Sequence, residues 1–161
     1  LVSHGSSTVP KYIVDEINAM GGELTNTYGI SIEELKAAIP AGISKINVDT
    51  DIRLAVTRNM KELFAKYPEK RTSASIGPIY ELLETKKNQF DPRVFLPPIM
   101  DTVMYGNVPD EDVTAIVSCV ERGVKEVVGT LIVEFGSFGK APLVEQVSLD
   151  EMAERYKKME K

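Results

Sequence analysis

The sequence of 161 residues has one cysteine, one histidine and no tryptophan. The single cysteine, Cys119, excludes a disulfide within the chain and is typical of a protein from a reducing compartment. No apolar run approaches the ~20 residues of a membrane span. The net charge of −5 disfavours nucleic acid, whose phosphates select basic surfaces. We therefore expect a cytoplasmic protein with neither a nucleic-acid nor a membrane partner.

The composition is that of an ordinary globular domain, with 43% hydrophobic and 27% charged residues. Its length is sufficient for one domain with a sizeable core. The chain does not begin with Met, and its first residues have the pattern of the end of a buried strand. We therefore expect the sequence to begin in the middle of a longer protein.

The most informative segment is Leu1–Pro10, which joins a short apolar strand to a helix. The strand ends at the only histidine, His4, and a turn of Gly5, Ser6 and Ser7 follows. A strand-to-helix junction of small residues exposes backbone N–H groups and hydroxyls, which together bind anions. A histidine at the strand end can bind a metal beside that anion site. The segment thus predicts a phosphate site next to a metal ligand.

A second strand and a helix follow the first strand–helix pair, which is the pattern of an α/β fold with parallel strands. Because βαβ connections are right-handed, we expect the two strands to be adjacent and parallel. Their carboxyl ends then bring together His4, Ser7, Asn47 and Asp49. The expected elements are a strand at Leu1–His4, helices at Pro10–Met20 and Ser31–Ile39, a strand at Ile43–Asp49, a helix capped by Thr50 or Asp51 and ending near Tyr67, helices at Gly77–Lys86, Pro98–Met104 and Pro109–Phe135, and a terminal helix opened by a capping box at Ser148.

Each of these residues also has a simpler structural interpretation. A lone histidine at a strand end is usually a satisfied polar residue, and a small-residue turn before a helix is usually only a turn and cap. Asp49 and Asp51 can cap the helix that follows them, and this is the favoured role for Asp51. Arg53 and Arg93 can be solvated surface side chains. The residues alone leave these alternatives open.

Four blocks of the sequence together resemble the C-terminal part of the class II, metal-dependent fructose-bisphosphate aldolases, and the tail with Ser148–Met152 resembles their class IIB branch. The blocks are His4–Ser7, Lys45–Ala55, Phe90–Arg93 and Phe135–Lys140. The resemblance implies the C-terminal part of a TIM (β/α)8 barrel, with strand seven ending at the first block and strand eight at the second. Residues 1–67 would then form the last two βα units. Residues 68–161 would form a helical C-terminal extension that packs on the barrel and on a neighbouring subunit.

The resemblance also implies the roles of individual residues. His4 would be one of three histidine ligands to a zinc ion, with a monovalent cation as a second candidate cofactor. The other two histidines and the acid–base residues belong to parts of the family that lie outside this chain, so no catalytic residue is expected within it. Arg53, and Arg93 reaching over from a neighbouring subunit, would bind the far phosphate of the substrate. The triose phosphate would be held by Gly5, Ser6, Ser7, Asn47, Val48, Asp49 and Thr50.

The activity implied by the resemblance is the reversible aldol cleavage of fructose 1,6-bisphosphate to dihydroxyacetone phosphate and glyceraldehyde 3-phosphate, in glycolysis and gluconeogenesis. The implied assembly is a homo-oligomer, a dimer or a tetramer. One alternative is a tagatose-bisphosphate aldolase, because the two sugars differ in stereochemistry at one carbon. Another is a non-catalytic fragment that gives only subunit contacts and phosphate binding. Residues Arg71–Gln89 are expected to be an insertion relative to compact class IIB enzymes, with a role that the sequence leaves open.

Overall fold

The computed structural model describes residues 1–25, 28–105, 109–144 and 146–159. Within these ranges, no helix is both long enough and apolar enough to cross a membrane. In chain order the elements are β1 (Val2–Ser3), α1 (Lys11–Ala19), α2 (Ile32–Ala38), β2 (Lys45–Ile46), α3 (Thr50–Lys66), the 3-10 helix η1 (Pro68–Thr72), α4 (Gly77–Thr85), the 3-10 helix η2 (Pro92–Val94), α5 (Pro97–Met104), α6 (Glu111–Glu134), the 3-10 helix η3 (Ala141–Leu143) and α7 (Leu149–Met159).

The two strands are adjacent and parallel, as the sequence predicts. Val2 of β1 lies opposite Lys45 of β2, and Ser3 lies opposite Ile46. The hydrogen-bonded ladder is shorter than the predicted strands, Leu1–His4 and Ile43–Asp49, because the first strand turns away at Gly5, where φ is +64°. The carboxyl ends of both strands therefore open into loops at the same edge of this small sheet.

The predicted helices agree with the structure to within about two residues, since their start signals are local. At α2 the Ser31 hydroxyl accepts from the Glu34 N–H at 3.2 Å, and the Glu34 carboxylate accepts from the Ser31 N–H at 3.0 Å. This is the predicted capping box. Asp110 caps α6 by accepting from the Val113 N–H at 2.8 Å, and Ser148 accepts from Glu151 at the start of α7.

The start of α3 differs from the prediction. We expected the Thr50 or Asp51 side chain to cap this helix, but the N-cap position is Asp49, and the Asp49 side chain makes no capping hydrogen bond. The Ser7 hydroxyl, from the loop after β1, accepts from the first N–H groups instead. The capping group is therefore distant in sequence, which local patterns do not reveal.

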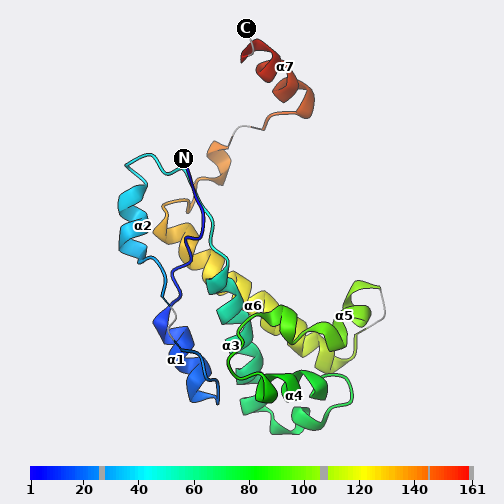
Figure 1. Ribbon diagram of the computed structural model, residues 1–161. Helices are drawn as coiled ribbons and strands as arrows, with labels where there is room; N and C mark the ends of the chain where they lie inside the picture. The colour runs from blue at the N-terminus through cyan, green and yellow to red at the C-terminus, as the bar shows by residue number, and fades with distance from the viewer. Residues whose placement is uncertain (26–27, 106–108, 145, 160–161) are drawn as a thin grey trace.

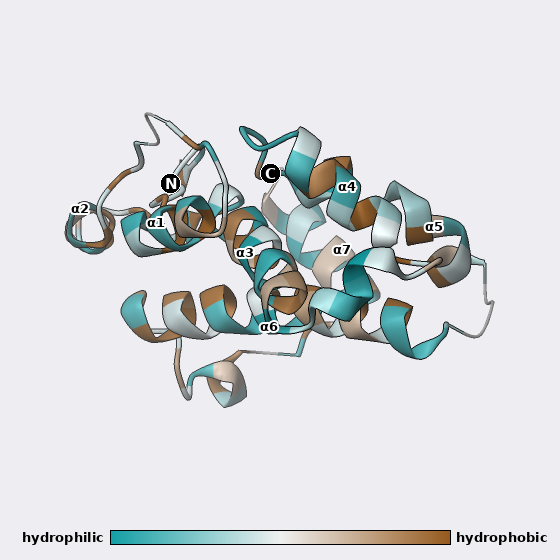
Figure 2. Ribbon diagram, turned by 90° about the horizontal axis from the view of Figure 1, so that it is seen from below, coloured by the Kyte–Doolittle hydropathy of each residue, from teal (hydrophilic) through white to brown (hydrophobic). Residues whose placement is uncertain are grey.

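Helix α3 lies at the centre of the molecule. Figure 1 shows α6 running alongside it, α1 on another side and α4 near its C-terminal end, while α7 stands apart from the other helices. In Figure 2, α1, α3 and α6 carry both brown and teal residues, as expected for helices with one buried side. Gly123 permits a close approach of α6 to α3, because a Cβ at this position would lie 2.8 Å from the Val56 nitrogen. Two core clusters flank α3 and include Ile13, Ile17, Leu54, Val127, Met60, Phe64, Ile79, Leu83, Phe95 and Ile116.

Candidate functional site

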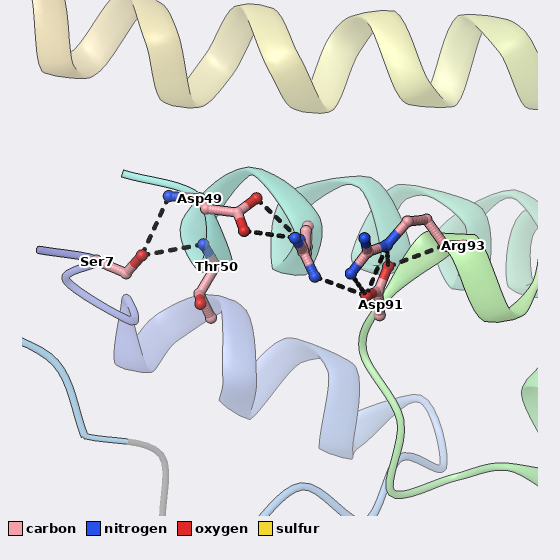
Figure 3. Close-up of polar contacts among 6 residues, drawn as sticks. Ser7, Asp49, Thr50, Asp91 and Arg93 are labelled. Atoms are coloured by element: carbon pink, nitrogen blue, oxygen red, sulfur yellow. Dashed lines mark hydrogen bonds and ion pairs between the residues drawn. The ribbon is translucent and has the colours of Figure 1, made fainter. Parts of the chain in front are cut away.

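The loop after β1 meets the N-terminus of α3 through one hydroxyl. Ser7 Oγ accepts from the backbone N–H of Asp49 at 3.1 Å and of Thr50 at 3.0 Å, as Figure 3 shows. A hydroxyl that accepts two hydrogen bonds still has its own proton to donate. Ser7 therefore presents an oriented O–H at the positive end of a helix dipole, a position that favours an anion.

Backbone donors remain available around Ser7. Among the described residues, the N–H groups of Gly5, Ser7 and Val48 have no hydrogen-bond partner. Ser6 has a different place, because its N–H donates to the Asn47 carbonyl at 3.2 Å and its buried hydroxyl lies 2.5 Å from that of Ser3. Ser6 thus ties the two strand ends together, and the free N–H groups beside it can bind phosphate oxygens.

His4 and Asn47 come together at the same edge. The Asn47 amide nitrogen lies 3.0 Å from His4 Nδ1, and the His4 side chain is exposed. Rotating the amide would place its oxygen there instead, to accept from an Nδ1–H. In either arrangement Asn47 fixes the orientation of the ring and leaves Nε2 open for a metal ion. Histidines that bind metals are commonly held in this way, by a hydrogen bond to the ring nitrogen that does not bind the metal.

Asp51 is the residue whose role the sequence missed. Its side chain is 1% exposed, and its carboxylate accepts from the Thr8 N–H at 3.0 Å, the Thr8 hydroxyl at 2.7 Å and the Val9 N–H at 2.8 Å. Val9 is held at φ +50°, a left-handed conformation that is costly for a β-branched residue. The predicted capping role of Asp51 is therefore wrong: this carboxylate fastens the loop after β1 to the first turn of α3.

Two arginines and two aspartates extend the site along α3. Arg53 donates to Asp49 through Nε at 2.8 Å and to Asp91 through a terminal nitrogen at 2.6 Å. Arg93 pairs with the same Asp91, at 2.5 Å through its terminal nitrogen. Figure 3 shows Asp49, Asp91 and Arg93 in this network. Since the Arg93 side chain is 72% exposed, it can reach an anion while Asp91 restrains it.

Asp91 is the shared partner of both arginines. The hydrogen bonds from the Arg93 side chain, its backbone N–H and the nearby charge of Arg53 lower the pKa of Asp91 from its ordinary value to about 2. Asp91 therefore remains ionised throughout the physiological pH range, so it holds both guanidinium groups at the site. The sequence singled out Phe90–Arg93 through Arg93, whereas the structure shows that Asp91 brings Arg93 to Arg53 within one chain.

Comparison with known proteins is consistent with this geometry. A family model described as "Fructose-bisphosphate aldolase class-II" matches residues 1–140. A fructose-bisphosphate aldolase of Xanthobacter flavus is 35% identical over 156 residues, which are 97% of this chain and 33% of that protein. One from Nostoc sp. is 34% identical over 160 residues, 99% of this chain and 33% of that protein. One from Giardia intestinalis is 34% identical over 157 residues, 98% of this chain and 36% of that protein. The chain spans about a third of the length of these relatives.

Proposed function

The chain belongs to the class-II fructose-bisphosphate aldolase family, and from this premise we propose that it supplies the last two βα units of a (β/α)8 barrel and the phosphate-binding part of an aldolase site. The exposed apolar side chains at the start of the chain support the barrel, since Leu1 is 80% exposed and Val2 of β1 is 48% exposed. Parallel strands are normally covered on both faces. Further strands of the barrel would cover these side chains, and the helices after α3 would pack outside it and against a second subunit.

One observation carries the proposed function. The carboxyl ends of both strands deliver a hydroxyl, free N–H groups and a histidine to one edge, where TIM-barrel enzymes hold their substrates. The Ser7 hydroxyl and the N–H groups of Gly5, Ser7 and Val48 bind the phosphate of the triose half. Asn47 and Asp49 lie beside them and orient the carbon chain of the substrate.

The histidine at this edge fits a metal ligand. His4 Nε2 is open, and Asn47 fixes the ring. A catalytic zinc takes at least three protein ligands, and the described residues contain no group of three metal-ligating side chains. His4 would therefore bind the ion together with two histidines outside this chain. When bound, zinc would act as a Lewis acid that polarises the ketone of the substrate.

The reaction we propose for the whole enzyme is the reversible aldol cleavage of fructose 1,6-bisphosphate to dihydroxyacetone phosphate and glyceraldehyde 3-phosphate. This chain binds the two phosphates at separate places. The near phosphate lies at the Gly5–Ser7 turn, and the far phosphate lies at Arg53 and Arg93. Because both arginines pair with Asp91 of their own chain, this arrangement replaces the expected reach of Arg93 alone from a neighbouring subunit. The group that moves the proton lies outside the chain. Holding both ends of the substrate fixes the bond to be cleaved relative to the metal.

Replacing Arg93 with alanine in the whole enzyme tests this assignment. A guanidinium–phosphate contact is worth about 1.5–3 kcal/mol, so kcat/KM for the bisphosphate should fall by roughly ten- to a hundred-fold. Proton exchange on dihydroxyacetone phosphate needs only the near phosphate site and the metal, so we expect it to be nearly unchanged. Both rates are measured on the same preparation, with fructose and tagatose bisphosphates compared for the cleavage.

A matched control is Arg122→Ala, which removes an exposed arginine of α6 that lies outside the site. It should change neither rate. Equal losses of cleavage and proton exchange in the Arg93 variant would show that Arg93 acts through folding or subunit contacts. The far-phosphate role would then be wrong.

A further inference from the structure

A cavity lies near the C-terminal end of α3, away from the phosphate site. Its volume is about 250 Å³, and two cationic side chains, Lys61 and Arg71, line it. Lys61 follows Asp51 by ten residues on the same helix, which places the two about 15 Å apart along its axis. The cavity is therefore distinct from the site at the strand ends.

Lys61 is buried, and none of the described carboxylates forms an ion pair with it. The residue is 5% exposed, and its ammonium donates one long hydrogen bond of 3.4 Å to the Met20 carbonyl, just beyond α1. Burial lowers the pKa of Lys61, with the nearby charge of Glu84 acting in the opposite direction. An ammonium in this position is strongly stabilised by an anion, because burial of an unpaired charge is costly.

Arg71 supplies the second positive charge. Its Nε donates to the Phe64 carbonyl at 2.9 Å, and its guanidinium lies 5.2 Å from the centre of the Tyr80 ring. Among the described residues no carboxylate forms an ion pair with Arg71. The backbone and ring contacts thus hold the guanidinium in place and leave its terminal nitrogens able to bind an oxyanion.

The walls of the cavity suit a small ligand. Phe64, Tyr80 and Leu83 provide apolar surface, and Glu84 is the only acidic side chain among the described residues that line the cavity. Two cations therefore face one carboxylate. The volume is below the ~300–1,000 Å³ of common ligand pockets, which limits the occupant to a compact molecule.

We propose that this cavity is a binding site for a small oxyanion-bearing metabolite, held by Lys61 and Arg71 and packed against Tyr80. Four of the residues that line it, Arg71, Tyr80, Leu83 and Glu84, belong to the segment Arg71–Gln89, which the proposed aldolase site does not use. The segment Arg71–Gln89 would then have a role, because it packs against α3 and forms the pocket that binds the anion. A bound anion bridges α3 and η1 at the end of α1, and it stabilises their packing by mass action.

Calorimetric titration of the full chain with inorganic phosphate and with malonate tests the proposal. The titrations use a Ser7→Ala background, which weakens phosphate binding at the strand ends. We expect saturable binding of at least one of the two anions at millimolar concentrations, and at least a tenfold loss of affinity in Lys61→Met. The anion that binds with the higher affinity shows whether the site prefers a phosphate or a carboxylate.

A second variant keeps the test independent of folding at the buried lysine. Glu84→Gln removes the one carboxylate of the lining from an exposed position, so anion affinity should rise several-fold. Glu81→Gln, an exposed glutamate of the same helix outside the cavity lining, is the control and should leave the affinity unchanged. The proposal fails if neither anion binds in the Ser7→Ala background, or if Glu84→Gln leaves the affinity unchanged.

Discussion

The Asp51→Leu variant is expected to lose about 2–4 kcal/mol of stability and to bind phosphate poorly at the strand ends. Leucine accepts none of the three hydrogen bonds that Thr8 and Val9 donate to the carboxylate. Two backbone N–H groups then lack a partner, at a cost of about 1–3 kcal/mol each when they are buried. Val9 also loses the contact that holds it at φ +50°. Urea denaturation measures the stability, and phosphate titration measures the binding.

Two further substitutions separate the causes of this loss of stability. Thr8→Val removes only the hydroxyl bond and should cost less than half as much as the Asp51 change. Glycine adopts a positive φ without strain, so Val9→Gly should recover part of the stability that the Asp51→Leu variant loses. If Asp51→Leu lowers the free energy of unfolding no more than Thr8→Val does, the Asp51 carboxylate does not fasten the loop, and other contacts hold it in place.

The second large effect is expected at the contact between α3 and α6. Alanine usually stabilises a helix relative to glycine, by up to about 1 kcal/mol. At Gly123, however, the new Cβ would lie 2.8 Å from the Val56 nitrogen and 2.9 Å from its Cα. Backbone atoms cannot yield without moving the helix, and overpacking costs about 1–3 kcal/mol or more. We therefore expect Gly123→Ala to destabilise the chain by about 2 kcal/mol.

Gly129 offers a matched control on the same helix. A Cβ there meets nothing within 4 Å, so Gly129→Ala should stabilise the chain by about 0.5–1 kcal/mol. The sign of the change thus differs between two glycines of one helix. Thermal or urea unfolding of the two variants measures it. Stabilisation by both alanines would show that α3 and α6 do not pack as closely as the structure shows.

The features that the sequence predicted correctly have local signals. The capping box at Ser31 and the Gly5 turn after β1 depend on residues within a few positions, so their patterns predict the structure directly. The adjacency of the strands also followed from a general rule of handedness. These features predict that His4 and Asn47 lie together, as the structure shows.

The features that sequence reasoning missed all join distant residues. Ser7 caps a helix that begins more than forty residues later, and Asp51 accepts from a loop equally far before it. Asp91 pairs with Arg53 of α3, 38 residues earlier in the chain. A serine or aspartate next to a helix start has the same local pattern whether it caps its own helix or a distant segment. The anion cavity was equally hidden, because Lys61 and Arg71 meet only after α3 and η1 pack.

The central claim is that this chain completes a class II aldolase site by supplying its phosphate-binding edge and one metal ligand. The most direct measurement is cleavage of fructose 1,6-bisphosphate by a chimera in which this chain replaces the matching third of the Xanthobacter flavus enzyme. We expect a folded, zinc-loaded chimera to cleave the sugar, its His4→Ala variant to be inactive, and the 161-residue chain alone to show no turnover. EDTA-sensitive turnover by the chain alone, or full activity of the His4→Ala chimera, would contradict the account.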